Sequence, residues 1–383
     1  MGLVLPEITQ ASGSHAFDAD GRRYLDLMNG FGAVFLGHAH PRVVEALHAQ
    51  ASSVWICGRH PTAAAAAAQQ QLRELLPQGM KPAGLCSTGM EAAEYAMRLA
   101  AVATGRAEFA GFARSMHGKS GMTAAMCWSN APLARDHIHM LPFVDAAPEE
   151  QVLAQLEALL ATRRLAAVFA EPIQGSNAAH EASAAFLPEV ARMCRRHGTL
   201  LVVDEILTGL YRTGTRFYVE RVGVAPDLML LAKSMGNGFP VSSVAVRGDL
   251  VVDARSMPGS TFSGNPLACA TVAATLGVMA ELDLEAQVAA IDQVVRGSLC
   301  RIAPSTATLR GRGALWALEF ADAGVCARVT AELLRDGILV SSYGQCVRLL
   351  PAATIDIAEL RLACQAIVRA CEAEEPVRVA GQR

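Results

Sequence analysis

Aromatic and charged side chains are scarce in this chain of 383 residues. Aromatic residues make up 5% and charged residues 18%, whereas hydrophobic residues make up 52%. Such a composition is typical of a compact globular protein and excludes a largely disordered one. The formal net charge is only −3, and both signs are scattered. We therefore expect no nucleic-acid-binding face and no basic membrane patch.

Signals for secretion, membrane insertion and metal binding are also lacking. The first residues, MGLVLPEITQ, have no basic stretch followed by an apolar one, which predicts no signal peptide. The run Ala63–Ala68 is short and flanked by polar residues, which indicates a helix and not a membrane span. The ten cysteines form no C-x-x-C pair, and His-rich tracts are absent. We expect reduced, buried thiols in a cytoplasmic protein and no metal site.

Apolar runs alternate with helical stretches between about residues 82 and 274. The strands that we predict there include Leu165–Ala170, Leu200–Val203, Leu228–Leu231 and Val241–Val246, and the helices include Glu91–Ala103 and Ala184–His197. This alternation predicts an α/β fold with a mainly parallel sheet between helices.

The alternation of apolar runs and helical stretches differs at both ends of the chain. Phe17–Gly21 is a hairpin-turn signal, and Pro41 suits the first turn of a helix that extends to about Ser53. The last third alternates strands and helices, which we place at Ala314–Phe320, Val325–Asp336, Val347–Leu349 and Asp356–Cys371. We predict a large domain over residues 46–280 and a smaller α+β domain formed by residues 1–45 and 281–383.

Two charged residues stand directly behind buried strands. Lys233 follows the apolar run that ends at Leu231 and precedes the small residues of Ser234–Gly238. Imine chemistry needs such an accessible amine in surroundings that lower its pKa, although a lone lysine is usually a solvated surface group. Asp204 ends an earlier strand, where open α/β sheets place ligand contacts. Its carboxylate suits a pyridinium nitrogen, and a helix cap or a salt bridge is the alternative.

Two stretches of small and hydroxyl residues precede helices, CSTGME at residues 86–91 and GSTFSGNPLA at residues 259–268. The start of a helix offers free N–H groups and a favourable dipole to a phosphate. An ordinary helix cap is the alternative for the first stretch. The two stretches, the aspartate and the lysine follow one another along the chain in an order that suits one cofactor. A phosphorylated aromatic cofactor would use all four.

From about Ala16 to Ile355, the chain resembles the class III (ornithine/ω-amino acid type) aminotransferases of pyridoxal-phosphate (PLP) fold type I. The motifs that carry the resemblance are FDADGRRYLD, GHAHP, STGMEAAEYAMRLA, MHGKSG, EPIQG, VVDEILTG, APDLMLLAKSMGNGFP, GSTFSGNPLA and RGRGALWALEF. The resemblance implies a homodimer that binds pyridoxal 5'-phosphate in sites at its interface.

The resemblance also implies roles for individual residues. Lys233 would form the Schiff base with the cofactor and transfer protons, and Asp204 would pair with the pyridine nitrogen. Arg348 would grip a substrate carboxylate, with a surface ion pair as the alternative. Further cofactor contacts would come from Thr88, Gly89 and Met90 at the phosphate, from Ile206 at one ring face, and from Thr261 across the dimer interface, with Glu171 as a support.

Four positions depart from the family's usual residues. Met116 stands where an aromatic residue usually stacks on the cofactor, and His117 is the other candidate for that contact. Lys119 replaces an arginine that many members use for a distal carboxylate. Ser176 replaces a frequent glutamate, and Leu207 replaces a glutamine. The altered positions 119 and 176 belong with Arg348 to the predicted substrate pocket.

The resemblance implies an aminotransferase that moves an amino group from an amino acid to a ketone or aldehyde, and the altered pocket positions favour a specialised biosynthetic acceptor. The alternatives are an aminomutase of the glutamate-semialdehyde type, which uses the same lysine and aspartate, and a non-catalytic cofactor-binding protein. The sequence leaves open the donor, the acceptor, and whether the substrate is free or bound to a carrier protein.

Overall fold

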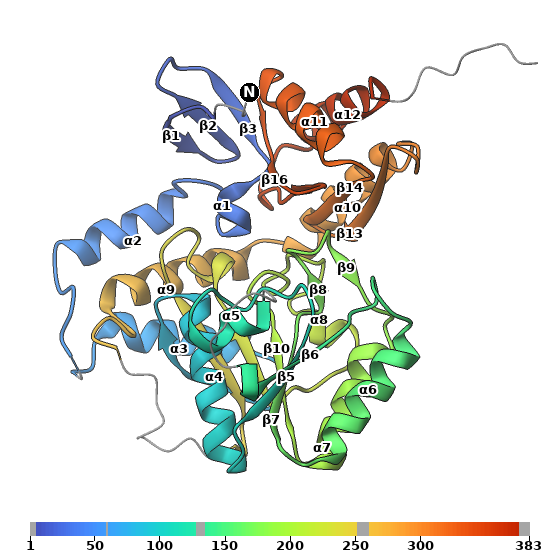
Figure 1. The fold of residues 1–383 in the computed structure, drawn as a ribbon. Coiled ribbons are helices and arrows are strands. Elements are labelled where there is room, and N and C mark those ends of the chain that lie inside the picture. Colours follow the sequence, from blue (N-terminus) through green and yellow to red (C-terminus); the bar gives the residue numbers. More distant parts are fainter. Residues whose placement is uncertain (1–4, 59, 128–134, 251–259, 375–383) are drawn as a thin grey trace, which may run out of the picture.

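The centre of the computed structural model is a seven-stranded sheet (Figure 1). The model describes residues 5–58, 60–127, 135–250 and 260–374. In spatial order, the strands are β4 (Met80–Cys86), β12 (Ser242–Arg247), β11 (Leu228–Leu231), β10 (Leu200–Asp204), β7 (Leu165–Ala170), β5 (Glu108–Phe112) and β6 (Ile138–Leu141). Strand β12 is antiparallel to both of its neighbours, and the other pairs are parallel. The predicted mainly parallel sheet is confirmed.

Helices cover both faces of this sheet, because its strands are apolar on both sides. Val202 packs with α4 (Gly89–Thr104) in one hydrophobic cluster, whereas its neighbours Leu201 and Val203 belong to the cluster on the opposite face. Successive strand residues point to opposite faces of the sheet. A strand that is apolar throughout is therefore buried only when helices pack on both faces. The second cluster includes residues of α3 (Ala63–Leu75), α6 (Glu149–Ala161), α7 (Phe186–His197) and α9 (Pro266–Glu281).

Two smaller sheets stand above the large one (Figure 1). The first contains β1 (Ile8–Ser12), β2 (His15–Asp18), β3 (Arg23–Asp26) and β15 (Ile338–Leu339), and the second contains β13 (Ala307–Arg312), β14 (Leu315–Phe320), β17 (Cys346–Leu349) and β16 (Ser341–Tyr343). Strand β3 pairs with β15, so segments from the two ends of the chain share one sheet. The boundaries near residues 45 and 280 stay predictions.

Helices also accompany the small sheets, namely α10 (Leu284–Leu299), α11 (Ala323–Arg335) and α12 (Ile357–Glu372), while α2 (Pro41–Ala51) packs on α9. The predicted hairpin and helices are confirmed, with ends that differ by a few residues. Side-chain caps explain several of these ends. Asp322 accepts a hydrogen bond from the N–H of Val325, and Asp356 accepts bonds from Ala358 and Glu359, which satisfies donors that the first turn leaves open.

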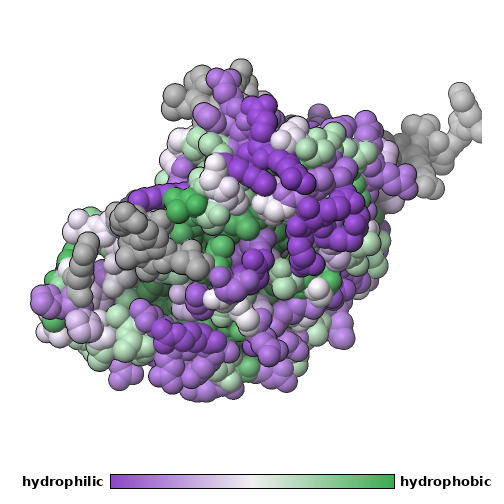
Figure 2. Space-filling model, turned by 90° about the horizontal axis from the view of Figure 1, so that it is seen from below, coloured by the Kyte–Doolittle hydropathy of each residue, from purple (hydrophilic) through white to green (hydrophobic). Residues whose placement is uncertain are grey.

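The cysteines and the surface agree with a globular chain. All ten thiols are free, and most are buried. Within the described residues, no single helix is long and apolar enough to cross a membrane, although α9 and α10, bent by 76°, pass that test as a pair. From below, hydrophilic residues cover much of the surface, and several hydrophobic ones show near the middle of that face (Figure 2).

Candidate active site

The carboxyl ends of β7, β10 and β11 meet at one edge of the large sheet and bring Glu171, Asp204 and Lys233 together. All three line a cavity of about 400 Å³. The complete lining is Phe31, Met116, Lys119, Glu171, Gly175, Ser176, Asp204, Ile206, Leu207, Lys233, Ser341, Ser342, Tyr343 and Arg348. This is the edge at which parallel α/β sheets bind ligands.

Lys233 occupies a strained position in this cavity. Its φ is +43°, in the left-handed region that side chains other than glycine rarely adopt. Burial lowers the pKa of its ammonium group, and the carboxylates of Asp204 and Glu171 oppose that shift. An amine with a lowered pKa is more often neutral, as a nucleophile must be.

Asp204 is held by hydrogen bonds on both carboxylate oxygens. Its Oδ2 lies 2.7 Å from Nδ1 of His117, and its Oδ1 accepts the N–H of Ile206 at 3.0 Å. Burial alone would lower the pKa of His117, but the hydrogen bond and the charge of Asp204 raise it above the usual range. The hydrogen bond with His117 holds the Asp204 carboxylate in the orientation that faces the cavity.

The two candidates for the stacking contact lie in different places. Met116 lines the cavity, whereas His117 is not among the lining residues. The His117 ring is fully buried and packs edge-on against Phe169, with ring centroids 5.6 Å apart. The salt bridge that the sequence left as an alternative for Asp204 is thus present, with His117 as its partner.

Glu171 braces the backbone on either side of the cavity. Its carboxylate accepts the N–H of Met116 at 2.7 Å and the N–H of Gly175 at 3.3 Å. Burial is the main cause that raises the pKa of Glu171 to about 7. Through these contacts Glu171 holds backbone beside the cavity, and its supporting role toward the cofactor stays a prediction.

Helix α4 begins directly beside the cavity. Thr88 caps this helix, since its Oγ1 accepts the N–H of Glu91 at 3.1 Å. The ordinary helix cap, which the sequence left as an alternative to a phosphate site, is therefore present. A Cβ added at Gly89 would lie 2.8 Å from Cδ1 of Ile206, a side chain that lines the cavity. The open N–H groups of the first turn, which include those of Gly89 and Met90, therefore lie next to it and suit a phosphate.

Arg348 reaches the cavity from β17 and is 8% exposed. Its Nη1 donates to the carbonyl of Gly175 at 2.9 Å, and its Nη2 donates to Oγ of Ser341 at 3.1 Å. Its guanidinium lies 5.0 Å from the centre of the Tyr343 ring. Among the described residues, it forms no ion pair, so the alternative of a surface ion pair is wrong. Its charge remains available to an anionic ligand.

The other predicted positions divide between the cavity and the surface. Lys119 and Ser176 line the cavity, and Leu207 fills space against Gly175, where an added Cβ would lie 2.2 Å from its Cδ2. Thr261 is exposed, precedes α9 and does not line the cavity. Sequence reasoning missed five lining residues. Gly175 ends the EPIQG motif but was given no role, and the other four lie outside the quoted motifs, namely Phe31, Ser341, Ser342 and Tyr343.

These groups suit a phosphorylated aromatic aldehyde. The cavity offers an amine, a carboxylate for a ring nitrogen, and apolar side chains of Ile206 and Met116 for the ring faces. A Cβ at Gly89 would require the Ile206 side chain to shift, so the start of α4 lies close against the cavity. Pyridoxal phosphate therefore fits the residues that are present.

Comparisons with known proteins give the same result. Residues 3–371 match the family model Aminotransferase class-III. The chain is 32% identical to 2-aminoadipate transaminase of Pseudomonas putida, over 92% of this chain and 93% of that protein. It is 34% identical to acetylornithine aminotransferase of Bacillus subtilis, over 91% and 90% of the two chains.

A solved structure resembles the whole fold. The ornithine aminotransferase of Toxoplasma gondii superposes with a TM-score of 0.86 and 28% identity, covering 97% of this chain and 91% of that one. These relatives are transaminases, and the aminomutase alternative has no better support. The chain therefore belongs to the class III aminotransferases, enzymes that depend on pyridoxal phosphate.

Proposed function

We propose that this enzyme transfers the amino group of a carboxylate-bearing amino acid to a ketone or aldehyde, with Lys233 and Asp204 as its catalytic residues. The observation that carries the proposal is that both side chains line one cavity, each at the carboxyl end of a parallel strand. Bound pyridoxal phosphate supplies a ring that withdraws electrons from the reacting carbon.

In this proposal, each chain residue has a limited task. Lys233 holds the cofactor and moves a proton at its Nζ, which the lowered pKa of its amine favours. Asp204 faces the ring nitrogen, and His117 fixes its carboxylate from behind. Met116 and Ile206 bound the ring, and the first turn of α4, from Thr88 to Met90, receives the phosphate.

Substrate recognition is assigned to the other side of the cavity. Arg348 lines it with no acidic partner among the residues that the structure describes, so a substrate carboxylate is the natural partner for its guanidinium. Lys119 and Ser176 lie in the same lining and would contact the remainder of the substrate.

The larger setting is also a proposal. We place the enzyme in the cytoplasm, in a biosynthetic step, as a homodimer in which the exposed Thr261 reaches the partner's cofactor phosphate. The free thiols are compatible with a reducing compartment. A substrate bound to a carrier protein stays a prediction.

A donor screen tests the proposal. The purified holoenzyme is mixed with single amino acids without an acceptor, and the visible absorbance of the bound cofactor is followed. We expect loss of that absorbance with at least one carboxylate donor, and recovery with release of a new amino acid when a keto acid is added. Isomerisation of one substrate without transfer to an added keto acid would contradict the proposal.

A further inference from the structure

A second cavity, of about 790 Å³, adjoins the cavity of Lys233. Three residues line both spaces, namely Met116, Ser176 and Tyr343. We call the cavity of Lys233 the inner cavity and the second one the outer cavity. The other residues that line the outer cavity are Ala113, Arg114, Ala125, Cys127, Met140, Asn177, Ala178, Glu319, Gly344, Gln345 and Cys346.

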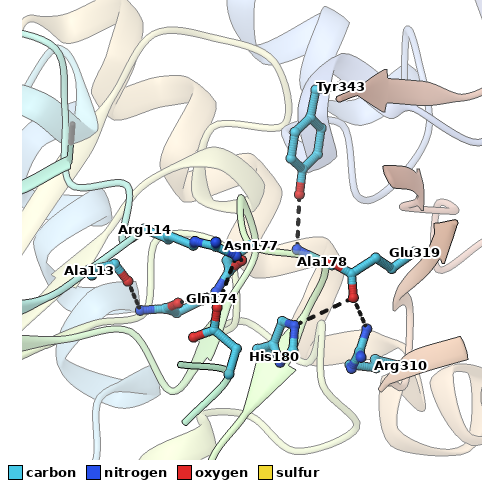
Figure 3. A network of polar contacts seen from close by, with 10 residues as sticks. Ala113, Arg114, Gln174, Asn177, Ala178, His180, Arg310, Glu319 and Tyr343 are labelled. Atoms are coloured by element: carbon cyan, nitrogen blue, oxygen red, sulfur yellow. Dashed lines mark hydrogen bonds and ion pairs between the residues drawn. The ribbon is translucent and has the colours of Figure 1, made fainter. Parts of the chain in front are cut away.

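Hydrogen bonds fix the loop that contains Asn177 and Ala178, two residues that line the outer cavity (Figure 3). Oη of Tyr343 accepts the N–H of Ala178 at 3.1 Å, which ties β16 of the small sheet to the loop after β8 (Ile173–Gln174). Gln174 donates to the carbonyl of Ala113 at 3.0 Å and accepts from Nδ2 of Asn177 at 2.9 Å. The outer cavity is thus a built feature at the junction of the large and small sheets.

The charges on the wall of the outer cavity are already paired. Arg114 forms an ion pair with Asp145 at 3.0 Å. Glu319 lies 2.6 Å from Arg310 and 3.7 Å from His180, and Figure 3 shows both partners directed at its carboxylate. No other lining residue carries a formal charge, and most of them are apolar. An uncharged chain fits such a wall, because a further ion would lack a partner there.

The boundary between the cavities includes Met116 and Ser176, which line both of them. Met116 has an unbranched, flexible side chain, and Ser176 is small and neutral. Neither residue places a rigid ring or a charge between the two cavities.

We propose that the outer cavity binds the distal part of the substrate, and that the substrate is an amino acid or its carbonyl counterpart with a long, uncharged side chain. This inference rests on the proposed function, because it takes the reacting end to Lys233 and the carboxylate to Arg348. The apolar atoms of that side chain would lie against Met116, Ala125 and Met140, which line the outer cavity.

Binding of unreactive ligands tests this inference without turnover. Isothermal titration compares butanoate with 6-acetamidohexanoate, two carboxylates without an amine, on the holoenzyme. We expect the longer ligand to bind at least about tenfold more tightly, since each methylene that leaves water contributes roughly a factor of four. Equal affinities for the two ligands would overturn the inference.

A substitution in the outer cavity tests whether the longer ligand gains its affinity there. Ala125 lies in helix α5 (Gly121–Cys127) and lines the outer cavity only. Ala125→Phe should remove the preference for the longer ligand and change the affinity for butanoate by less than about twofold. Ala125→Ser, which keeps the volume small, should retain the preference. An unchanged preference in Ala125→Phe would also overturn the inference.

The outcomes separate this inference from the proposed function. If short amino acids convert the cofactor but the longer carboxylate gains no affinity, the function stands and the outer site is wrong. If the longer ligand binds through the outer cavity but no amino acid reacts, the proposed transfer is wrong and the binding site stands.

Discussion

Burial lowers the pKa of the Lys233 amine against the opposing effect of Asp204 and Glu171, and the backbone of this residue is in the left-handed region. Strain of this kind persists where the surrounding structure fixes it and is concentrated at functional sites. We predict that borohydride attaches the cofactor to Lys233. Lys233→Ala should still bind cofactor through its phosphate but should lose turnover. Peptide mapping that finds the reduced adduct on another lysine would refute the assignment.

Asp204 gives a second test at the residue scale. We predict that Asp204→Asn lowers kcat by orders of magnitude and spares much of the cofactor affinity, because the charge acts mainly in the transition state and α4 binds the phosphate separately. Steady-state kinetics and cofactor titration measure the two effects. Asp249→Asn, an exposed aspartate beside Arg247, is the control. A kcat near that of wild type would remove Asp204 from this role.

Arg348 gives a test of substrate recognition. Because its two Nη atoms donate to Gly175 and Ser341 and to no carboxylate of the described residues, a charge-assisted pair with a carboxylate is available and contributes about 1.5–3 kcal/mol. Arg348→Ala should raise KM for carboxylate donors about 10- to 150-fold and leave simple amines little changed. An equal rise for both types of donor would mean that Arg348 is only structural.

At the scale of elements, Arg212 joins distant parts of the chain. Its fully buried guanidinium donates to the carbonyls of Gly32, Ala314 and Pro351 at 2.7–3.2 Å and lies 4.4 Å from the ring centre of Phe35. Burial lowers its pKa to about 9. These contacts tie the loop after β10 to the N-terminal segment and to the small sheets above the site.

We therefore predict that Arg212→Ala destabilises the fold by about 3–5 kcal/mol, because buried carbonyls lose their donors and a large cavity opens. Arg216→Ala is the control, since Arg216 forms only a partly exposed pair with Glu220 four residues away and should change stability by less than about 1 kcal/mol. Urea unfolding of the two variants measures the difference. Similar midpoints would contradict the role of Arg212.

Several of the elements were predictable from the sequence, although β4, β5 and β6 of the large sheet were not among the predicted strands. Leu165–Ala170 and Leu228–Leu231 were predicted with the bounds that the structure has, because a strand buried on both faces is a continuous apolar run. The short strands β8, β15 and β16 were not predicted. They contain two or three residues each, and only pairing with distant segments makes them strands.

For the whole molecule, the open question is association. Trp55, Phe262 and Phe31 are each more than half exposed, and large exposed apolar residues favour an interface. We predict a dimer, or a larger assembly built from it, in which Thr261 contacts the partner. Light scattering during size-exclusion chromatography measures the mass of the active species. A fully active monomer would rule the dimer out.

The sequence alone determined the family through the order of its motifs, and it placed Lys233 and Asp204 at the ends of predicted strands, because those features are local. Only the tertiary structure decided which side chains surround them. Tyr343 and Ser341 reach the cavity from β16, more than 100 residues beyond Lys233 along the chain. His117 lies behind Asp204 and not in the cavity, since packing against Phe169 turns its ring inward. Such contacts depend on how distant segments pack, which no spacing of residues records.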